Sequence, residues 1–410
     1  MTIGIRLITG ILGMSNKGKL SEKPLVMVLG IRPDIIRASL IINSLRDKLG
    51  KNFKLVWSGQ HYSENLKDVF FNELGVGKPD YELAISGEND AELVSSMISK
   101  LSTILNAIEP KAVVFLGDTN TVTGTIAAGQ LNFPIVHIEG CMRSYDWRMP
   151  EEKYRTIADH LSDLIYCYLD KYKAQGIAEG IPDENIIVTG NPIVDVLEHY
   201  YLSANEKISK EEIKKILNDK YSIHSDGFFV MTCHRRENIE TFESLKRIMD
   251  LAENLPHEVI FPAGYRTQVM LKKYDIKISN KIVMVDPIGY KELLDLMSHS
   301  KGVLTDSGTV IEEVAILGIP AIQMRTATER PEVYEFGSAI RFDPHTESDS
   351  RQTINDFLNI RPKSWKHTFG DGKSSRRIVE DLISRYESGT FRGHQKEKYF
   401  PYSKRSYSLE

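Results

Sequence analysis

Three acidic side chains follow short apolar runs or open a helix in the first half of the sequence. Asp118 comes after "AVVFLG", Glu139 comes after "IVHI", and Glu151 follows Pro150 in "PEEKYR". In α/β proteins, ligands bind beyond the carboxyl ends of the strands, and acids that sit there commonly move protons. Asp118 and Glu139 are therefore candidate catalytic acids. Glu151 alone would be an ordinary acid in the first turn of a helix.

Arginines accompany these acids. Arg32 and Arg37 stand at the start of the helix that follows the first apolar run, in "GIRPDIIR". They would suit a polyanionic ligand, although a surface ion pair with Asp34 is the alternative. Glu151, Arg155 and Asp159 are spaced four apart, which on its own predicts only an ion-pair ladder along one helix face.

The second half contains a candidate anion site in "TDSGTVIEE". Ser307 and Gly308 follow an apolar strand and open a helix, whose free backbone N–H groups attract a diphosphate. Glu312 or Glu313 could accept hydrogen bonds from ribose hydroxyls, as the acid of a dinucleotide fold does. Ordinary helix capping explains the same residue types and stays open as an alternative.

Two further residues have suitable chemistry. Arg330 in "TERPE" could pair with a phosphate, and His234 in "CHRREN" follows a strand. A lone histidine there is more often structural than catalytic. Near three acids and an anion site, His234 becomes a candidate acid/base or phosphate-binding group.

The elements that must position these residues alternate between strands and helices. Helices are predicted over residues 33–50 and 90–109, and a charged helix near 208–217. Brief apolar runs predict buried parallel strands at 24–30, 53–59, 111–117, 134–140, 164–169, 227–233, 258–264, 281–287, 302–308 and 320–325. This alternation predicts an α/β protein with two Rossmann-like, doubly wound domains that face a cleft.

The domain limits follow from the break near residues 190–225. We expect a first domain at 23–195 with the catalytic acids, a second at 196–365, and a terminal helix at 366–388 that packs back on the first. Residues 1–22 are expected to be a poorly ordered extension, with a signal peptide as the alternative. Residues 389–410 are expected to be a solvated tail or a clamp onto a partner subunit.

Composition narrows the class of ligand. The 410 residues contain 41% hydrophobic and 26% charged residues with a net charge of −4, which gives no electrostatic reason to expect nucleic acid or a membrane as partner. Three cysteines without a CxxC predict neither a disulfide nor a zinc site and fit the cytoplasm. The first domain has no G-x-G-x-x-G and no P-loop, so neither NAD nor ATP chemistry is indicated.

The motifs taken together resemble a known family. The order "GIRPDIIR", "SGQH", "GDTNT", "HIEGCMRS", "MPEEKYR", "VTGNP", "CHRRENIE", "TDSGTVIEE", "TERPE" and "FGDGKSSRRIV" is similar to that of the non-hydrolysing UDP-N-acetylglucosamine 2-epimerases. The resemblance covers residues 24 to about 385.

The resemblance implies a fold like that of the GT-B glycosyltransferases, with a UDP-amino sugar between the domains. The implied reaction inverts C2 through elimination of UDP to a 2-acetamidoglucal and re-addition, with no metal or other cofactor. It also implies a homodimer. The positions that match the family's catalytic residues are Asp118, Glu139, Glu151 and His234, and those that match its substrate-binding residues are Arg32, Arg37, Arg155, Ser307, Gly308, Glu313 and Arg330.

Several departures from the family pattern bear on the substrate. Cys141, Met142 and Tyr154 replace the usual residues and are expected to reshape the sugar pocket. The short "RSYDWRMPEE" connection resembles relatives that act on modified UDP-amino sugars, such as diacetamido-uronates or deoxy-hexosamines. Tyr62 and Gly264 alter a regulatory site of the family, so substrate activation is not expected. A GT-B glycosyltransferase and a non-catalytic UDP-sugar-binding protein remain alternatives.

Overall fold

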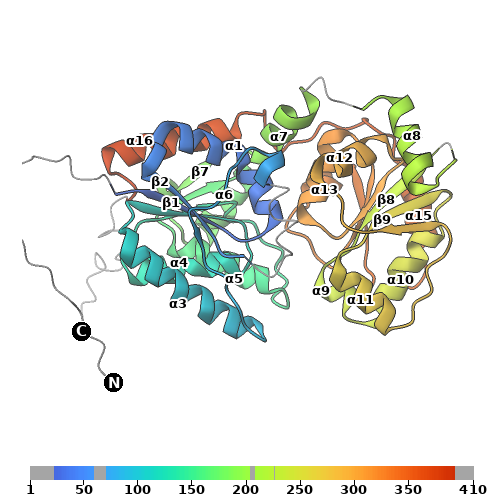
Figure 1. Cartoon of the computed structure of the whole chain (residues 1–410), viewed down its shortest axis with the longest axis horizontal. Helices are drawn as coiled ribbons and strands as arrows, with labels where there is room; N and C mark the ends of the chain where they lie inside the picture. Colours follow the sequence, from blue (N-terminus) through green and yellow to red (C-terminus); the bar gives the residue numbers. More distant parts are fainter. Residues whose placement is uncertain (1–22, 60–70, 204–207, 226, 393–410) are drawn as a thin grey trace, which may run out of the picture.

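Two parallel β-sheets, one in each half of the chain, form the frame of the molecule (Figure 1). The computed structural model describes residues 23–59, 71–203, 208–225 and 227–392. The first sheet has the order β3-β2-β1-β4-β5-β6-β7 and the second the order β10-β9-β8-β11-β12-β13. Chain order reverses between β1 and β4 in the first sheet and between β8 and β11 in the second, as in Rossmann-type folds. The predicted fold class, two doubly wound α/β units, is confirmed.

Helices cover both faces of each sheet (Figure 1). The strands are β1 (Leu25–Leu29), β2 (Phe53–Trp57), β3 (Tyr81–Glu82), β4 (Ala112–Leu116), β5 (Ile135–Ile138), β6 (Leu164–Cys167), β7 (Ile186–Val188), β8 (Phe228–Thr232), β9 (Glu258–Pro262), β10 (Ile282–Val285), β11 (Val303–Thr305), β12 (Ala321–Met324) and β13 (Ala339–Phe342). The α-helices are α1 (Arg32–Leu49), α3 (Asp90–Ile108), α4 (Gly124–Gln130), α5 (Pro150–Leu161), α6 (Asp170–Ala178), α7 (Pro192–Leu197), α8 (Lys210–Tyr221), α9 (Arg236–Ile239), α10 (Phe242–Glu253), α11 (Tyr265–Lys273), α12 (Tyr290–His299), α13 (Gly308–Leu317), α14 (Glu332–Glu335), α15 (Arg351–Asn359) and α16 (Ser374–Ser388). Short 3-10 segments lie at Gly50–Asn52, Asn120–Thr123 and Asp183–Asn185, and a π-helical turn at Glu198–Leu202.

Burial explains why the central strands are continuous apolar runs. All five residues of β1 and all five of β4 are buried, because helices lie on both sides of the sheet. The register of the parallel pair β4–β5 places Leu116 beside Ile138. The residues that follow these two strands therefore leave the sheet next to each other.

Three strands were not predicted from the sequence. β3 is an exposed pair of residues, β7 is three residues long, and β13 is partly exposed. Such short edge segments lack an apolar run long enough to show a strand pattern. The ten predicted strands are all present.

The two halves contact each other directly. The Tyr172 hydroxyl on α6 donates to the Glu329 carbonyl at 3.1 Å, and Arg236 on α9 pairs with Asp90 on α3 at 3.0 Å. A continuous apolar cluster runs from beneath α1 and α7 to α12 and α13. Among the residues that the structure describes, no helix is both long and apolar enough to cross a bilayer.

The last helix returns to the first half of the molecule. Helix α16 packs against α1 and α7 (Figure 1). Its first turn is capped from outside the helix, because the buried Asp195 carboxylate on α7 accepts the backbone N–H of Ser374 at 3.1 Å and that of Ser375. A carboxylate in this place satisfies free N–H groups and opposes the helix dipole.

Replacing Asp195 should therefore loosen α16. We expect Asp195→Ala to lower the free energy of unfolding by about 0.5–2 kcal/mol, the usual effect of losing a helix cap. Urea denaturation measures this loss, and hydrogen exchange of residues 374–388 should accelerate more than that of α15. Equal acceleration in both helices would contradict the capping role.

Candidate functional site

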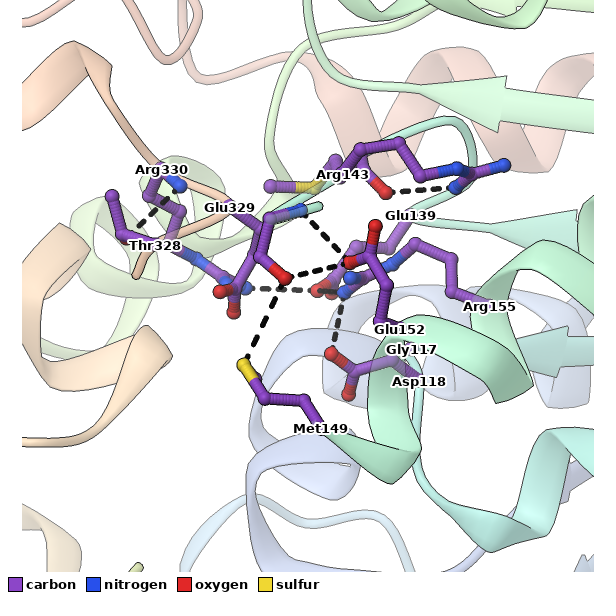
Figure 2. A network of polar contacts seen from close by, with 12 residues as sticks. Gly117, Asp118, Glu139, Arg143, Met149, Glu152, Arg155, Thr328, Glu329 and Arg330 are labelled. Atoms are coloured by element: carbon purple, nitrogen blue, oxygen red, sulfur yellow. Dashed lines mark hydrogen bonds and ion pairs between the residues drawn. The ribbon is translucent and has the colours of Figure 1, made fainter. Parts of the chain in front are cut away.

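Asp118 and Glu139 lie side by side and share one arginine. They follow the paired ends of β4 and β5, and Arg155 reaches both from α5 (Figure 2). One Arg155 nitrogen, Nη2, donates to Asp118 Oδ2 at 2.6 Å and to Glu139 Oε1 at 3.1 Å. Arg155 thus forms hydrogen bonds with two acids that follow strands. The ion-pair ladder with Glu151 and Asp159 that the sequence spacing allowed is not formed by Arg155.

Glu139 is the most heavily contacted of the acids. It is fully buried, and its backbone has a left-handed φ of 74°. Arg330 Nη2 donates to its Oε1 at 2.8 Å, and the Tyr168 hydroxyl donates to its Oε2 at 3.0 Å. Arg37 pairs with Oε2 as well. Glu139 is therefore surrounded by donors from α1, α5, the end of β6 and the second half of the chain.

Arg330 brings the second half to this site, as Figure 2 shows. Its Nε donates to Glu312 Oε1 on α13 at 2.7 Å, and it also pairs with Glu329. Burial opposes ionisation of Glu329, but Arg325 and Arg330 outweigh it and hold the pKa of this carboxyl well below its ordinary value. The cluster therefore alternates acids and guanidinium groups, and it joins both halves.

The start of α13 lies against Arg330. Ser307 caps this helix by accepting the Val310 N–H at 3.3 Å. A Cβ placed on Gly308 would come within 2.7 Å of Arg330 Nη1, so glycine is the residue that lets the guanidinium approach. Ser307, Gly308 and Arg330 thus combine a helix N-terminus with a cation, which is a suitable setting for an anion.

Glu313 lies behind this helix start. The Tyr290 hydroxyl donates to Glu313 Oε1 at 2.7 Å. Burial raises the pKa of Glu313 to about 7, against the opposing effects of the Tyr290 hydroxyl and Arg32. Arg32 is therefore near Glu313, whereas Arg37 on the same helix contacts Glu139 and also the buried Asp34 at 3.3 Å.

The environments of Asp118 and Glu151 push their pKa values in opposite directions. Burial would raise the pKa of Asp118, but Arg155 and more distant arginines lower it below the ordinary value. For Glu151, burial dominates and raises the pKa, although Arg235 opposes the shift. Two neighbouring acids whose pKa values are shifted in opposite directions suit the roles of base and acid in proton transfer.

His234 is held by an acid that the sequence reasoning did not single out. Asp306 accepts the backbone N–H groups of His234 and Arg235 at 2.9 Å each, and its Oδ1 lies 3.2 Å from His234 Nδ1. Asp306 is fully buried, whereas the His234 side chain is 58% exposed. A carboxylate directly after the apolar run "GVLT" was the signal that could have identified Asp306.

The structure thus joins Arg37, Asp118, Glu139, Arg155 and Arg330 in one network. It places Gly308, which follows the helix cap Ser307, against Arg330. Glu151 lies near Asp118, Glu313 lies with Arg32, and His234 lies on the loop held by Asp306. The sequence reasoning missed several members of the cluster, which are Tyr168, Asp306, Glu312 as an ion-pair partner, Arg325 and Glu329. Glu329 belongs to "TERPE" and Arg325 lies three residues before this motif, in which only Arg330 had been predicted as a site residue.

Cys141 and Met142 were expected to reshape the sugar pocket, and this stays a prediction. Both side chains are buried in the apolar core. A Cβ on Gly176 of α6 would lie 2.5 Å from Cys141 Sγ, so this thiol packs against α6 instead of facing the acids. Tyr154 does lie near Glu151, whose charge contributes to the raised pKa of the Tyr154 hydroxyl after the larger effect of burial. Tyr62 lies outside the described residues.

The buried position of Arg330 leads to a stability prediction. Arg330→Met should leave Glu139 and Glu312 buried without their shared cation, which typically costs about 3–5 kcal/mol. Urea denaturation measures the loss. Arg376→Met is the control, because Arg376 pairs with Glu380 on the exposed face of α16 and should change stability little. Equal effects of the two changes would show that the buried network does not support the fold.

Comparisons with known proteins agree with this geometry. The family model described as UDP-N-acetylglucosamine 2-epimerase matches residues 43–383. The UDP-N-acetylglucosamine 2-epimerase of Methanocaldococcus jannaschii is 36% identical over 369 residues, which cover 87% of this chain and 98% of that protein. The UDP-2,3-diacetamido-2,3-dideoxy-D-glucuronate 2-epimerase of Pseudomonas aeruginosa is 30% identical over 368 residues, which cover 87% and 99%.

Solved structures give the same answer. The crystal structure of the M. jannaschii enzyme in complex with UDP-GlcNAc and UDP matches with a TM-score of 0.79 and 34% identity, covering 88% of this chain and 99% of that one. The enzyme from Neisseria meningitidis bound to UDP-GlcNAc matches with a TM-score of 0.75 and 27% identity, covering 88% and 100%. This chain belongs to the UDP-N-acetylglucosamine 2-epimerase family.

Proposed function

We propose that the protein is a non-hydrolysing 2-epimerase that inverts C2 of a UDP-N-acetylhexosamine of the UDP-GlcNAc/UDP-ManNAc type. The observation that carries the proposal is the shared network of Asp118, Glu139 and Arg155, completed across the two halves by Arg330. It combines carboxylates for proton transfer with guanidinium groups for a diphosphate. Relatives bound to UDP-GlcNAc support the choice of ligand.

The diphosphate would bind where the second half supplies donors. The free N–H groups at the start of α13 and the guanidinium of Arg330 converge there, beside Ser307 and Gly308. Arg37 and Arg155 would contact the sugar and phosphate from the first half. We assign Glu313 to the nucleoside, together with Arg32. His234 would act beside the diphosphate on its exposed loop.

The proposed reaction breaks and remakes the same two bonds. A carboxylate removes the proton from C2, the C–H electron pair forms the C1=C2 double bond, and the C1–O bond breaks so that UDP leaves with its electrons. The 2-acetamidoglucal then takes UDP back at C1 and a proton at the opposite face of C2. General acid/base action contributes about 10²–10⁴-fold, and stabilisation of the leaving diphosphate by cations supplies a further share.

Asp118 and Glu151 differ in how their surroundings affect ionisation. Burial opposes ionisation of Asp118, whose side chain is 14% exposed, but Arg155 outweighs it and lowers the pKa, whereas burial raises the pKa of Glu151. Glu139 is occupied by Arg37, Arg155, Arg330 and Tyr168 when no ligand is bound. A diphosphate would compete for these arginines, and this exchange would release Glu139 to face C2.

A modified UDP-amino sugar is the second candidate substrate. Tyr154 lies beside Glu151, where it would contact a substituent of the sugar. The connection before α5 is held by Glu152, which accepts the Ser144 N–H at 2.8 Å and the Tyr145 N–H at 3.0 Å. The 30% identical relative from P. aeruginosa carries a diacetamido-glucuronate in its name, which supports testing such a sugar.

We further propose a cytoplasmic homodimer in which residues 23–195 and 196–365 act as two domains around the substrate. The buried free cysteines Cys141, Cys167 and Cys233 fit a reducing compartment. The homodimer rests on the family resemblance, and light scattering after size-exclusion chromatography tests it.

An exchange experiment tests the reaction. The protein is incubated in D₂O with UDP-GlcNAc and separately with UDP-2,3-diacetamido-2,3-dideoxyglucuronate, and the C2 proton is followed by NMR. Deuterium at C2 with the UDP linkage intact and formation of the 2-epimer is the expected result. Free sugar would indicate a hydrolysing enzyme, and inertness toward a panel of UDP-hexosamines would refute the epimerase function.

The role of Glu139 has its own test. Glu139→Gln should slow C2 exchange by at least about 10²-fold, because an amide cannot take up the proton, while calorimetry still detects UDP binding. Glu292→Gln is the matched control, since Glu292 is a partly buried acid that contacts Lys220 and Tyr221 away from the site. Undiminished exchange in Glu139→Gln would remove Glu139 from the mechanism.

A further inference from the structure

A buried histidine and aspartate lie directly behind the two strand-exit acids. His137 is on β5, Asp159 is on α5, and both are fully buried. His137 Nδ1 lies 2.7 Å from Asp159 Oδ1, and His137 Nε2 lies 2.8 Å from the carbonyl oxygen of Gly117. Gly117 immediately precedes Asp118 in the chain.

Asp159 also contacts the turn after β5, which contains Glu139 and Cys141. Asp159 Oδ2 accepts the backbone N–H of Cys141 at 2.9 Å and the Arg143 guanidinium at 2.7 Å. Burial opposes ionisation of Asp159, but His137 and Arg143 outweigh it and keep the pKa of this carboxyl below its ordinary value. Each ring nitrogen of His137 therefore lies within hydrogen-bonding distance of an oxygen, one on Asp159 and the other on the backbone of Gly117.

The turns that receive these bonds have an unfavourable backbone. Gly117, Glu139 and Cys141 all have positive φ angles, of 86°, 74° and 65°. For residues other than glycine, this conformation persists only where the surroundings fix it. At Gly140, a Cβ would come within 2.5 Å of Asp159 Oδ1, so the pair is packed closely against the turn that carries Glu139.

We propose that His137 and Asp159 are positioning residues that hold the turns of Asp118 and Glu139 at a fixed separation, so that both carboxylates meet one substrate. The inference rests on the proposed function, because it concerns the same two acids. His137 tethers the first turn through Gly117, and Asp159 tethers the second through Cys141. Neither residue contacts the reacting atoms. A misplacement of about 1 Å in such a site can cost about 10²-fold in rate.

Variants of His137 separate its two hydrogen bonds, one to Asp159 and one to Gly117. His137→Phe removes both hydrogen bonds and introduces a somewhat larger ring, and His137→Gln can keep the hydrogen bond to Gly117. We expect His137→Phe to lower kcat by about 10²-fold and His137→Gln to lower it less. The Kd for UDP should stay within about twofold, because the arginines and α13 remain in place.

The control is Tyr166→Phe. Tyr166 lies on the neighbouring strand β6, is equally buried, and donates from its hydroxyl to Asp381 at 2.7 Å on the other side of the sheet. This change should leave kcat unaltered. A drop in thermal stability and UDP affinity together, with kcat per folded molecule unchanged, would reduce His137 to a structural residue and overturn the inference, as would normal kcat in both His137 variants.

A second variant guards against failure of His137→Phe to fold. Asp159→Asn keeps the shape of the side chain and weakens both tethers, so it should also lower kcat more than UDP affinity. The double variant with His137→Gln should lose little more than the worse single variant, since residues that act as a unit are not additive. Additive losses would contradict a shared role.

One readout does not depend on turnover. In the NMR spectrum, the proton between His137 Nδ1 and Asp159 and the proton between Nε2 and the Gly117 carbonyl should be protected from exchange with solvent, and rapid exchange of either would refute the bridge. If the wild-type protein turned over no UDP-sugar but both protons were protected, the proposed function would fail while the bridge stood. If the wild type turned over and the variants did too, only the positioning role would fail.

Discussion

The contact between Glu139 and Arg330 is the interaction on which the rest of the structure depends. It joins the two halves through two groups that are both buried, with 2.8 Å between their atoms. A buried charge is strongly unfavourable unless it is paired and hydrogen-bonded. Within its own half, Glu139 also pairs with Arg37 and Arg155. Arg330 likewise pairs with Glu312 and Glu329 in the second half. The Glu139–Arg330 contact therefore joins two buried charge clusters into one network that crosses the two halves.

The same constraint makes ligand binding an exchange of partners. Without a ligand, Arg37, Arg155 and Arg330 are neutralised by carboxylates, so the interior is not left with uncompensated charge. A diphosphate that took over these arginines would displace carboxylates from them. The site would thereby spend part of its binding energy on freeing the acids, which lowers affinity but makes proton transfer depend on bound substrate. Such an arrangement protects buried carboxylates from solvent until they are needed.

Much of the fold was predictable because apolar strands and amphipathic helices have local signatures. The strand-exit positions of Asp118, Glu139 and Ser307 followed from those signatures alone. The pairing of these residues did not, since Arg330 lies 191 positions after Glu139 and nothing local links them. Asp159 shows the same limit: its spacing from Arg155 indicated a helix-face ion pair, whereas in the fold it turns inward to His137. The short strands β3 and β7 were missed because two or three residues cannot display a period.

The residues that depart from the family pattern differ in how close they lie to the acids of the site. Cys141 packs against α6, so its change acts on the sugar only through the turn that it shares with Glu139. Tyr154, in contrast to Cys141, lies near one of the acids. It precedes Arg155 in the first half of α5 and is close to Glu151. Discrimination between substrates that differ by one substituent requires a group within reach of that substituent. The start of α5 thus combines a side chain that departs from the family pattern with an acid whose pKa is raised by burial, whereas Cys141 packs in the apolar core.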